Sequence, residues 1–293
     1  MIPKVSIVTP SMNQVEYLES TIKSLLDQEC QNLEYIVIDG GSDDGSVDII
    51  RKYEHKLTFW SSEPDKGQYD AINKGFSRST GEIMGWLNSD DMHLPWTLSV
   101  VGEIFAHFPD VEWITTMYPL IWDSQCRVVN ADLFPEVDLQ GFLNGECLPS
   151  PKWHGRAFVQ QESTFWRRRL WDKAGGALNT DYPLAADLDL WARFFKHADL
   201  VRVATPLAGF RMHSGQKTDV QFNQYLDDAD RVLVEHGGQP YSPMELFLKR
   251  KVFPSLSWRS RRLMGWCGGN PRFYRVCRCD LRGAGWGVDQ IWA

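Results

Sequence analysis

The sequence lacks any apolar run long enough to form a membrane-spanning helix. Its longest apolar stretches lie between Lys56 and Glu63 and between Glu82 and Asp90, whereas a helix needs about 20 residues to cross a bilayer. The residues before Val5 leave no room for a signal peptide, so we expect a cytoplasmic protein. With 43% hydrophobic and 24% charged residues, the composition excludes disorder, collagen and coiled coil as the main state.

Cysteines and glycine-rich motifs are also scarce. The six cysteines form no CxxC pair, and structural zinc needs four ligands at recognisable spacings, so we expect reduced thiols and no zinc. No GxGxxG motif follows a predicted strand, because Gly40, Gly41 and Gly45 have the wrong spacing, and neither a Walker loop nor a GxSxG turn occurs. The sequence therefore favours phosphate binding through a metal ion over binding through a glycine-rich loop.

Charge is unevenly distributed along the chain. Ten Lys and Arg residues but only two acidic residues follow Leu248, a balance of +8, whereas the whole chain carries −7. An acidic body argues against a nucleic-acid-binding core, and the basic tail predicts an anionic partner. Because aromatic residues are interleaved with these cations, we expect residues 249–282 to dock on an anionic membrane surface at the inner face of the plasma membrane. The alternative is that the cations pack against the acidic body.

Strand-like and helix-like patterns alternate in the first 115 residues and indicate an α/β fold. Helical spacing begins near Leu18, Ser46 and Tyr69, and strands are predicted at Val5–Thr9, Leu33–Asp39, Leu57–Trp60, Ile83–Leu87 and, further on, Gln161–Trp166. We predict a mostly parallel central sheet flanked by helices. One domain is expected over residues 1–240, with a nucleotide-binding half (1–115) and an acceptor half (116–240), followed by a basic, aromatic-rich helical extension over 241–293.

Polar and acidic residues stand at the ends of three predicted strands, namely Thr9-Pro10-Ser11, Asp39 and Asn88-Ser89-Asp90-Asp91. In open parallel sheets, ligands bind outside the carboxyl ends of the strands. Adjacent carboxylates repel each other unless a cation compensates, and a divalent cation completed by substrate phosphates is the usual use of such a pair. The alternative is that Ser89 and Asp90 cap the helix expected near Pro95.

Taken together, eight segments resemble family 2 glycosyltransferases in order and spacing. They are Val5–Ser11, Asp39–Ser46, Asn73–Gly75, Thr80–Ile83, Leu87–Asp91, Gln160–Arg168, Ala186–Trp191 and Arg211–His213. The resemblance covers about residues 4–215. It implies the GT-A nucleotide-diphospho-sugar transferase fold, dependence on Mg²⁺ or Mn²⁺, and transfer with inversion.

The resemblance also implies roles for single residues. Thr9, Pro10 and Asp39 would hold the nucleoside, with Asp39 accepting a hydrogen bond from the base. Asp90 matches the second aspartate of the DxD signature and would bind the metal, with Asp91 and His213 in support. Asp187 would be the general base. Further candidates for donor binding are Asn13, Lys66, Asn73, Asn88 and Ser89, and candidates on the acceptor side are Gln161, Trp166 and Arg211.

Three positions depart from the family pattern. Asn88 replaces the first aspartate of DxD, Gly40 replaces a frequent second aspartate after the second strand, and Ala186 replaces the glutamate that usually precedes the base. Asn88 can still accept a hydrogen bond from a ribose or a water. Asp189 is expected to be structural and to pair with Arg193, because residues two apart on a helix point in different directions.

We therefore expect a glycosyltransferase that moves a sugar from a nucleotide-sugar to a glycan or a lipid-linked acceptor. A UDP-sugar is the first expectation, with dTDP- and GDP-sugars left open. One alternative is a sugar nucleotidylyltransferase, which should carry a glycine- and arginine-rich loop where Thr9–Asn13 stands. The other is a catalytically inactive sugar-binding protein of the same fold, which would tolerate loss of the aspartates that are present here.

Overall fold

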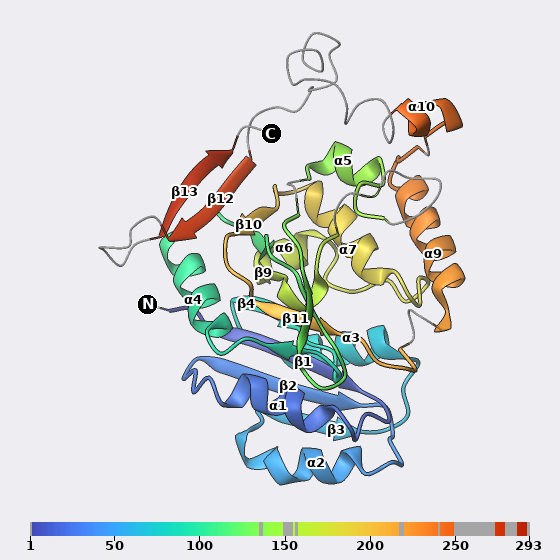
Figure 1. The fold of residues 1–293 in the computed structure, drawn as a ribbon. Helices are drawn as coiled ribbons and strands as arrows, with labels where there is room; N and C mark the ends of the chain where they lie inside the picture. Colours follow the sequence, from blue (N-terminus) through green and yellow to red (C-terminus); the bar gives the residue numbers. More distant parts are fainter. Residues whose placement is uncertain are drawn as a thin grey trace.

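The computed structural model describes residues 2–134, 137–148, 155, 158–216, 220–239, 241–248, 273–278 and 286–291. Within these residues the backbone forms a large sheet with the strand order β13-β12-β10-β6-β9-β4-β1-β2-β3 and a smaller sheet with the order β5-β11-β7-β8 (Figure 1). Helices cover both faces of the large sheet, so the predicted α/β architecture is confirmed.

The strands of the large sheet are β1 (Val5–Ser11), β2 (Leu33–Asp39), β3 (Phe59–Ser62), β4 (Ile83–Trp86), β6 (Trp113–Thr116), β9 (Phe165–Arg167), β10 (Val201–Val203), β12 (Phe273–Arg278) and β13 (Trp286–Ile291). The smaller sheet contains β5 (Met92–His93), β7 (Leu120–Trp122), β8 (Val128–Ala131) and β11 (Ala208–Arg211). The main helices are α1 (Leu18–Leu26), α2 (Ser46–Tyr53), α3 (Gln68–Arg78), α4 (Thr97–His107), α5 (Leu139–Leu143), α6 (Arg168–Lys173), α7 (Ala186–Phe195), α9 (Phe222–Glu235) and α10 (Pro243–Phe247).

Parallel pairing dominates the part of the large sheet that carries the predicted site. Strands β3, β2, β1 and β4 run parallel to one another. Strand β9 lies between β4 and β6 and is antiparallel to both. The carboxyl ends of β1, β2 and β4 therefore meet at one edge of the sheet, where the polar residues of the sequence stand.

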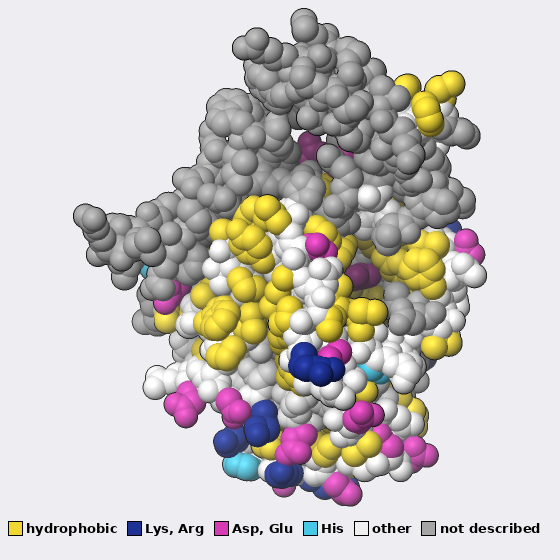
Figure 2. All heavy atoms as spheres, viewed as in Figure 1, with side chains coloured by type: hydrophobic (Ala, Val, Ile, Leu, Met, Phe, Trp, Pro, Cys, Tyr) yellow, Lys and Arg dark blue, Asp and Glu magenta, His cyan; other side chains and the backbone are white. Residues whose placement is uncertain are grey.

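Each face of the large sheet has its own apolar core. Helices α1, α2 and α4 pack on one face through residues such as Ile22, Ile50 and Ile104, and helices α3, α6, α7 and α9 pack on the other. The helical spacing of apolar residues in α1 explains its packing on the sheet, because Leu18, Ile22 and Leu25 are all fully buried. On the face drawn in Figure 2, charged side chains lie mainly at the lower end, over α1 and α2, and apolar side chains gather across the middle.

Two predicted elements differ from the structure. The strand expected over Gln161–Trp166 begins as a 3-10 turn, Gln161–Ser163, and only then enters β9. The hydroxyl of Ser163 donates to Gln160 Oε1 at 2.9 Å, and its backbone N–H donates to Gln160 O at 3.1 Å. Such local bonds compete with a strand ladder.

The expectation of a helical tail holds for α10 but not for β12 and β13, which pair antiparallel with each other. Residues 273–278 mix aromatic, basic and β-branched residues, a composition typical of strands. Other residues of the tail, among them most of 249–282, lie outside the described residues. Among the described residues, no helix is both long and apolar enough to span a bilayer.

A buried carboxylate, Glu34, joins three segments at the amino-terminal end of β1. Its side chain accepts hydrogen bonds from Lys4 Nζ (2.7 Å), Ser6 Oγ (2.5 Å) and Thr80 N (2.6 Å). The backbone N–H of Gly81 donates to it at 3.2 Å, and a Cβ at this glycine would collide with Ser6. Although burial alone would raise the pKa of this carboxyl, the bonds from Lys4, Ser6 and Thr80 lower it to about 2. The Thr80-Gly81 motif is thus explained by packing.

We predict that Glu34→Gln lowers the free energy of unfolding by about 2–4 kcal/mol at pH 7, because buried donors lose a charged acceptor. The folded-state pKa lies below the unfolded value of about 4.3. The stabilisation is therefore complete above that value and is lost as the pH falls toward 2. In urea unfolding, the difference in the free energy of unfolding between wild type and variant should become smaller from pH 5 to pH 3. Exposed Glu54→Gln is the control and should change stability by less than about 0.5 kcal/mol.

Candidate active site

Asp39 is fixed by hydrogen bonds at the carboxyl end of β2. The residue is fully buried. Its Oδ2 accepts hydrogen bonds from Gly41 N (3.1 Å), Ser42 N (2.8 Å) and Ser62 Oγ (2.7 Å). Its Oδ1 accepts from the Ser42 hydroxyl (2.6 Å) alone, whereas Oδ2 accepts three hydrogen bonds, so Oδ1 is the oxygen with capacity left for a ligand. These neutral donors allow the carboxylate to be buried without a cation.

The end of β1 lies beside Asp39. Ser11 is its register partner, and the buried Ser11 Oγ has no hydrogen-bond partner among the described residues. Thr9 is fully buried and its hydroxyl contacts the Tyr35 hydroxyl at 3.1 Å, and Pro10 is buried in the same strand. Of these residues, Ser11 offers the unused polar group, whereas the Thr9 hydroxyl is engaged in the core.

Exposed Asn13 closes the loop that covers Asp39. Its backbone has a φ of 52°. Its N–H donates to Ser42 Oγ at 2.8 Å and its Oδ1 accepts from Asp43 N at 3.0 Å. The side chain therefore shapes the loop between the ends of β1 and β2.

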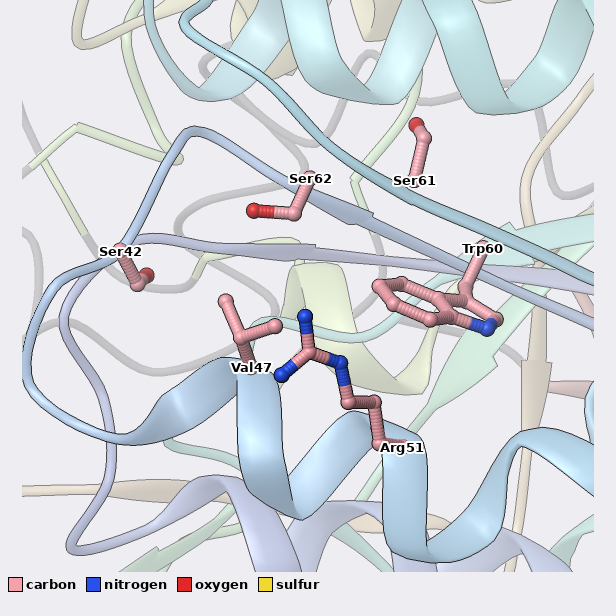
Figure 3. Close-up of a pocket in the computed structure, with 6 residues that line it drawn as sticks. All are labelled: Ser42, Val47, Arg51, Trp60, Ser61 and Ser62. Carbon is pink, nitrogen blue, oxygen red and sulfur yellow. The ribbon is translucent and has the colours of Figure 1, made fainter.

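A pocket of about 540 Å³ lies on the α2 side of this loop and is lined by Ser42, Val47, Arg51, Trp60, Ser61 and Ser62 (Figure 3). In the close-up, Arg51 extends from α2 between Val47 and Trp60. The hydroxyls of Ser42 and Ser62 bond to Asp39. Two residues that line the pocket thus hold the Asp39 carboxylate in place.

The loop after β4 brings Asp90 to His213. The distance from Asp90 Oδ2 to His213 Nε2 is 3.0 Å. The ring of Tyr17 lies against His213, with 4.4 Å between ring centroids, and the guanidinium of Arg211 lies 4.9 Å from the centroid of the Tyr17 ring. Arg211 is buried and donates to Ser20 Oγ at 2.9 Å. Arg211 therefore packs against Tyr17, and Tyr17 packs against His213. This buried position differs from the acceptor side predicted for Arg211.

Asp91 points into the protein. Its Oδ1 accepts from Arg211 N at 2.8 Å and its Oδ2 from Asn88 Nδ2 at 3.3 Å. Burial, followed by the charges of Asp90 and Glu162, raises the pKa of Asp91 well above its usual range. The carbonyl of Ser89 accepts from Thr21 Oγ1 at 2.9 Å. Asp91 thus joins the loop to β11, and the backbone at Ser89 joins it to α1.

The donor set at Asp90 suits a hard divalent cation that substrate oxygens complete. Among the described residues, no three His, Cys, Asp or Glu side chains form a metal-binding group. Asp90 and His213 offer one carboxylate and one imidazole nitrogen that already face each other. Mg²⁺ and similar ions are often held by one or two protein groups together with substrate phosphates and waters. The residues present therefore fit such an ion.

Asp187 lies in the first turn of α7 and is half-buried. Burial raises the pKa of its carboxyl to about 6, although hydrogen bonds from the backbone N–H groups of residues 187 and 188 and from Tyr69 lower it. The Tyr69 hydroxyl donates to Asp187 Oδ1 at 3.5 Å. The preceding residue of α3, Gln68, donates to Asn88 Oδ1 at 2.7 Å. Two adjacent residues of α3 thus connect the Asp90 loop with Asp187.

Asp189 has a separate, structural environment, as predicted. It is buried and bonded to Arg193 Nε at 2.9 Å and to His236 Nε2 at 2.9 Å. Although burial would raise the pKa of this carboxyl, His236 and Arg193 lower it. His236 follows the last residue of α9. Asp189 therefore joins α7 to the end of α9.

Glu162 was not among the predicted site residues. It stands in the 3-10 turn Gln161–Ser163 and is 4% exposed, and its Oε1 has no hydrogen-bond partner among the described residues. Burial, together with the charges of Asp90 and Asp187, raises the pKa of this carboxyl to about 8, although hydrogen bonds from its own backbone N–H and from Gln160 lower it. The sequence carries one usable signal, a single glutamate inside a run from Val159 to Trp166 that is otherwise uncharged.

Several predicted site residues have other roles in the structure. Trp166 is fully buried and packs against Phe76 and other core rings, so the prediction that it meets the acceptor is wrong. It lies in a central strand, and its side chain packs in the apolar core on one face of the sheet, where a ligand has no access. Asn73 exchanges hydrogen bonds of 2.9 and 2.8 Å with the backbone of Leu178, so its amide joins α3 to that loop.

Gln161 and Lys66 keep free polar groups. Gln161 Nε2 donates to Trp86 O at 2.7 Å, and its Oε1 has no hydrogen-bond partner within the described part of the chain. Lys66 is exposed just before α3, and its backbone N–H donates to Asp70 Oδ2 at 3.1 Å. Trp86, Trp113 and Trp191 are fully buried and belong to the core.

Sequence and structure comparisons identify relatives of this chain. The sequence profile of glycosyl transferase family 2 matches residues 6–121. An uncharacterized glycosyltransferase of Rickettsia typhi is 36% identical over 236 residues, which cover 76% of this chain and 68% of the relative. An uncharacterized glycosyltransferase of Mycobacterium tuberculosis is 41% identical over 90 residues, but the match spans only about a third of that relative (34%) and 30% of this chain.

A solved structure with the same fold is glucosyl-3-phosphoglycerate synthase from Mycobacterium tuberculosis in complex with Mn²⁺, UDP and glucosyl-3-phosphoglycerate. The TM-score is 0.54 at 16% sequence identity, and the match covers 82% of each chain. At this identity the likeness shows the fold, which is GT-A as predicted.

We predict that Asp189→Asn lowers the free energy of unfolding by about 2–4 kcal/mol, because Arg193 and His236 lose a buried anionic partner. Chemical denaturation at pH 7 measures this change. His236→Gln should cost less, because Arg193 still pairs with Asp189. A wild-type stability in Asp189→Asn would contradict the structural role.

Proposed function

Since the chain belongs to glycosyl transferase family 2, we propose that it transfers a sugar from a nucleoside diphosphate sugar to a hydroxyl group of an acceptor. A UDP-sugar is the proposed donor, and a glycan or a lipid-linked glycan is the proposed acceptor. The proposal includes a divalent cation and inversion at the anomeric carbon.

One observation carries the proposal. Gln68 and Tyr69, adjacent at the start of α3, bond to Asn88 and to Asp187. The loop of Asn88, which can hold a diphosphate, and Asp187, which can accept a proton, are therefore linked through two consecutive residues. This link supports the proposal, because an inverting transferase needs its leaving-group site and its base near the same carbon, on opposite sides of it.

The donor would occupy the carboxyl ends of β1, β2 and β4. Asp39 Oδ1 and Ser11 Oγ have unused hydrogen-bonding capacity and are proposed to meet the nucleoside. Asp90 and His213 are proposed to hold Mg²⁺ or Mn²⁺, and the Mn²⁺ and UDP bound by the synthase of the same fold support this choice. The cation would offset the charge of the departing diphosphate. Arg211 and Tyr17 keep His213 in place.

Asp187 is proposed to take the proton of the acceptor hydroxyl. As the oxygen forms its bond to the anomeric carbon, the bond from that carbon to the diphosphate oxygen breaks, and the electron pair leaves with the nucleoside diphosphate. One displacement from the opposite face inverts the anomeric centre. The position of Asp187 in the first turn of α7 also favours its anionic form, because the helix dipole is positive there.

The membrane partner expected for the basic tail stays a prediction from the sequence, since most of residues 249–282 lie outside the described residues.

A donor screen tests the proposed function. Purified protein is incubated with UDP-, GDP- and dTDP-sugars, each with Mn²⁺, with Mg²⁺ or with EDTA, and nucleoside diphosphate release is measured. We expect release from one or a few UDP-sugars, and loss of release with EDTA. No release and no nucleotide binding across the panel would refute the proposal.

We predict that Asp187→Asn lowers kcat by about 10²–10⁴-fold while donor affinity stays near wild type, because general-base catalysis is lost. For the wild type, kcat/KM should rise through pH 6 and then level off, because the base must be deprotonated and its pKa is about 6. Tyr69→Phe should move this midpoint to higher pH, because the hydroxyl stabilises the anion. Asp189→Asn is the matched control, and its folded fraction should keep the wild-type kcat.

We predict that Asp90→Asn and His213→Ala each weaken binding of UDP in the presence of Mn²⁺ by at least about tenfold, because each removes one of two facing ligands. Isothermal titration calorimetry with and without Mn²⁺ measures this. UDP binding without metal should change much less in both variants. If the Mn²⁺-dependent affinity were unchanged in Asp90→Asn, the cation would have to lie elsewhere.

A further inference from the structure

The turn Gln161–Ser163 lies between the two sheets at the candidate active site. Gln161 Nε2 donates to the carbonyl of Trp86 at the end of β4, and the carbonyl of Glu162 contacts His93 Nε2 of β5 at 3.1 Å. Strand β4 leads into the Asp90 loop, and β11, which also packs against the turn, leads to His213. The turn is therefore held by its amide and carbonyl groups. The Glu162 carboxyl accepts from Gln160 and from its own backbone N–H, and its Oε1 has no hydrogen-bond partner among the described residues.

No cation neutralises the Glu162 side chain in the described part of the chain. Its Oε1 is buried without a hydrogen bond. His93 contacts the backbone carbonyl and not the carboxylate, and burial lowers the pKa of its ring to about 4, so it is neutral. A buried carboxyl oxygen without a partner costs free energy, because it has lost water and gained no hydrogen bond in return. Each such atom in a folded protein needs an explanation, and a ligand that supplies the missing donor is one.

Asp90 and Asp187 both lie close enough for their charges to act on Glu162. In the proposed reaction, the diphosphate leaves on the Asp90 side and the acceptor hydroxyl arrives on the Asp187 side. The transferred sugar ring would then lie between these two residues. The turn that carries Glu162 contacts the end of β4 and β11, the strands that lead to Asp90 and His213, so Glu162 stands next to this position. Sugar hydroxyl groups are the donors that a buried carboxyl oxygen can bind there.

We propose that Glu162 binds hydroxyl groups of the donor sugar through its unpartnered Oε1 and thereby determines which sugar is transferred. This inference rests on the proposed function. Glu162 is therefore expected to contribute to binding of the sugar and not to binding of the nucleoside, the diphosphate or the cation.

The experiment compares UDP with UDP-sugars in wild type and in Glu162→Gln, which keeps the size of the side chain. Calorimetry gives the affinity for UDP with Mn²⁺. Steady-state release of UDP from UDP-glucose, UDP-galactose, UDP-N-acetylglucosamine and UDP-N-acetylgalactosamine gives kcat/KM for each sugar. We expect UDP affinity within about twofold of wild type. For the best wild-type sugar, kcat/KM should fall by about tenfold, the upper end of the range for losing one hydrogen bond between neutral groups. The order of preference among the four sugars should also change.

Glu162→Asp and Glu112→Gln serve as controls. Glu162→Asp retains the carboxyl group and should keep the wild-type order of preference with a smaller loss of kcat/KM. Glu112 pairs with Arg169 just before β6, and Glu112→Gln should behave as wild type. Circular dichroism and thermal unfolding check that each variant is folded. If Glu162→Gln destabilises the protein, Glu162→Asp carries the comparison.

Three results would overturn the assignment. An equal fall in the affinity for UDP and in kcat/KM for the UDP-sugars would place Glu162 at the diphosphate or the cation. Unchanged kcat/KM and sugar preference in Glu162→Gln would leave it no role in sugar binding. Absence of nucleotide binding and of turnover with UDP-, GDP- and dTDP-sugars in the wild type would instead refute the proposed function, and the assignment would fall with it.

Discussion

The dominant physical constraint on this protein is the burial of carboxylates along one edge of its main sheet. The hydrogen bonds and contacts that offset the cost of burial differ from one carboxylate to the next. Asp39 accepts four hydrogen bonds from neutral donors, whereas Asp90 shares a contact with His213. Asp187 has only a long bond from Tyr69 besides its own helix terminus, and Glu162 Oε1 has none among the described residues. The degree of compensation thus separates groups that shape the site from groups left ready for a ligand.

The same edge also shows how distant segments form one site. The loop after β4, the start of α3, the start of α7 and His213, two residues after β11, all contribute. Buried Arg211 connects several of them, since its backbone binds Asp91 while its side chain supports Tyr17 and Ser20. Because these contacts are shared, a change at one segment is transmitted to the others through packed polar groups.

Much of the fold and part of the site could be predicted from the sequence. Regular spacing identified α1, and uninterrupted apolar runs identified β1, β2 and β4, because these elements bury a whole face or both faces. Position at strand ends was enough to select Asp39 and Asp90. Trp166 and Asn73 could not be placed, because a motif does not tell which way a side chain points. Glu162 escaped notice because its importance depends on which partners it lacks, and only the three-dimensional structure contains that information.

Strand β9 has a consequence for how the chain acquires its fold. It stands in the middle of the large sheet, between β4 and β6, yet it comes about fifty residues after β6 in the sequence. Until residues 165–167 are present, β4 and β6 each expose an unpaired edge, and unpaired edges invite association with other chains. Pairing across such a sequence separation is intrinsically slow. The amino-terminal half is therefore not a self-sufficient folding unit, and a protein synthesised from its amino terminus must keep these edges apart until the late strand emerges from the ribosome.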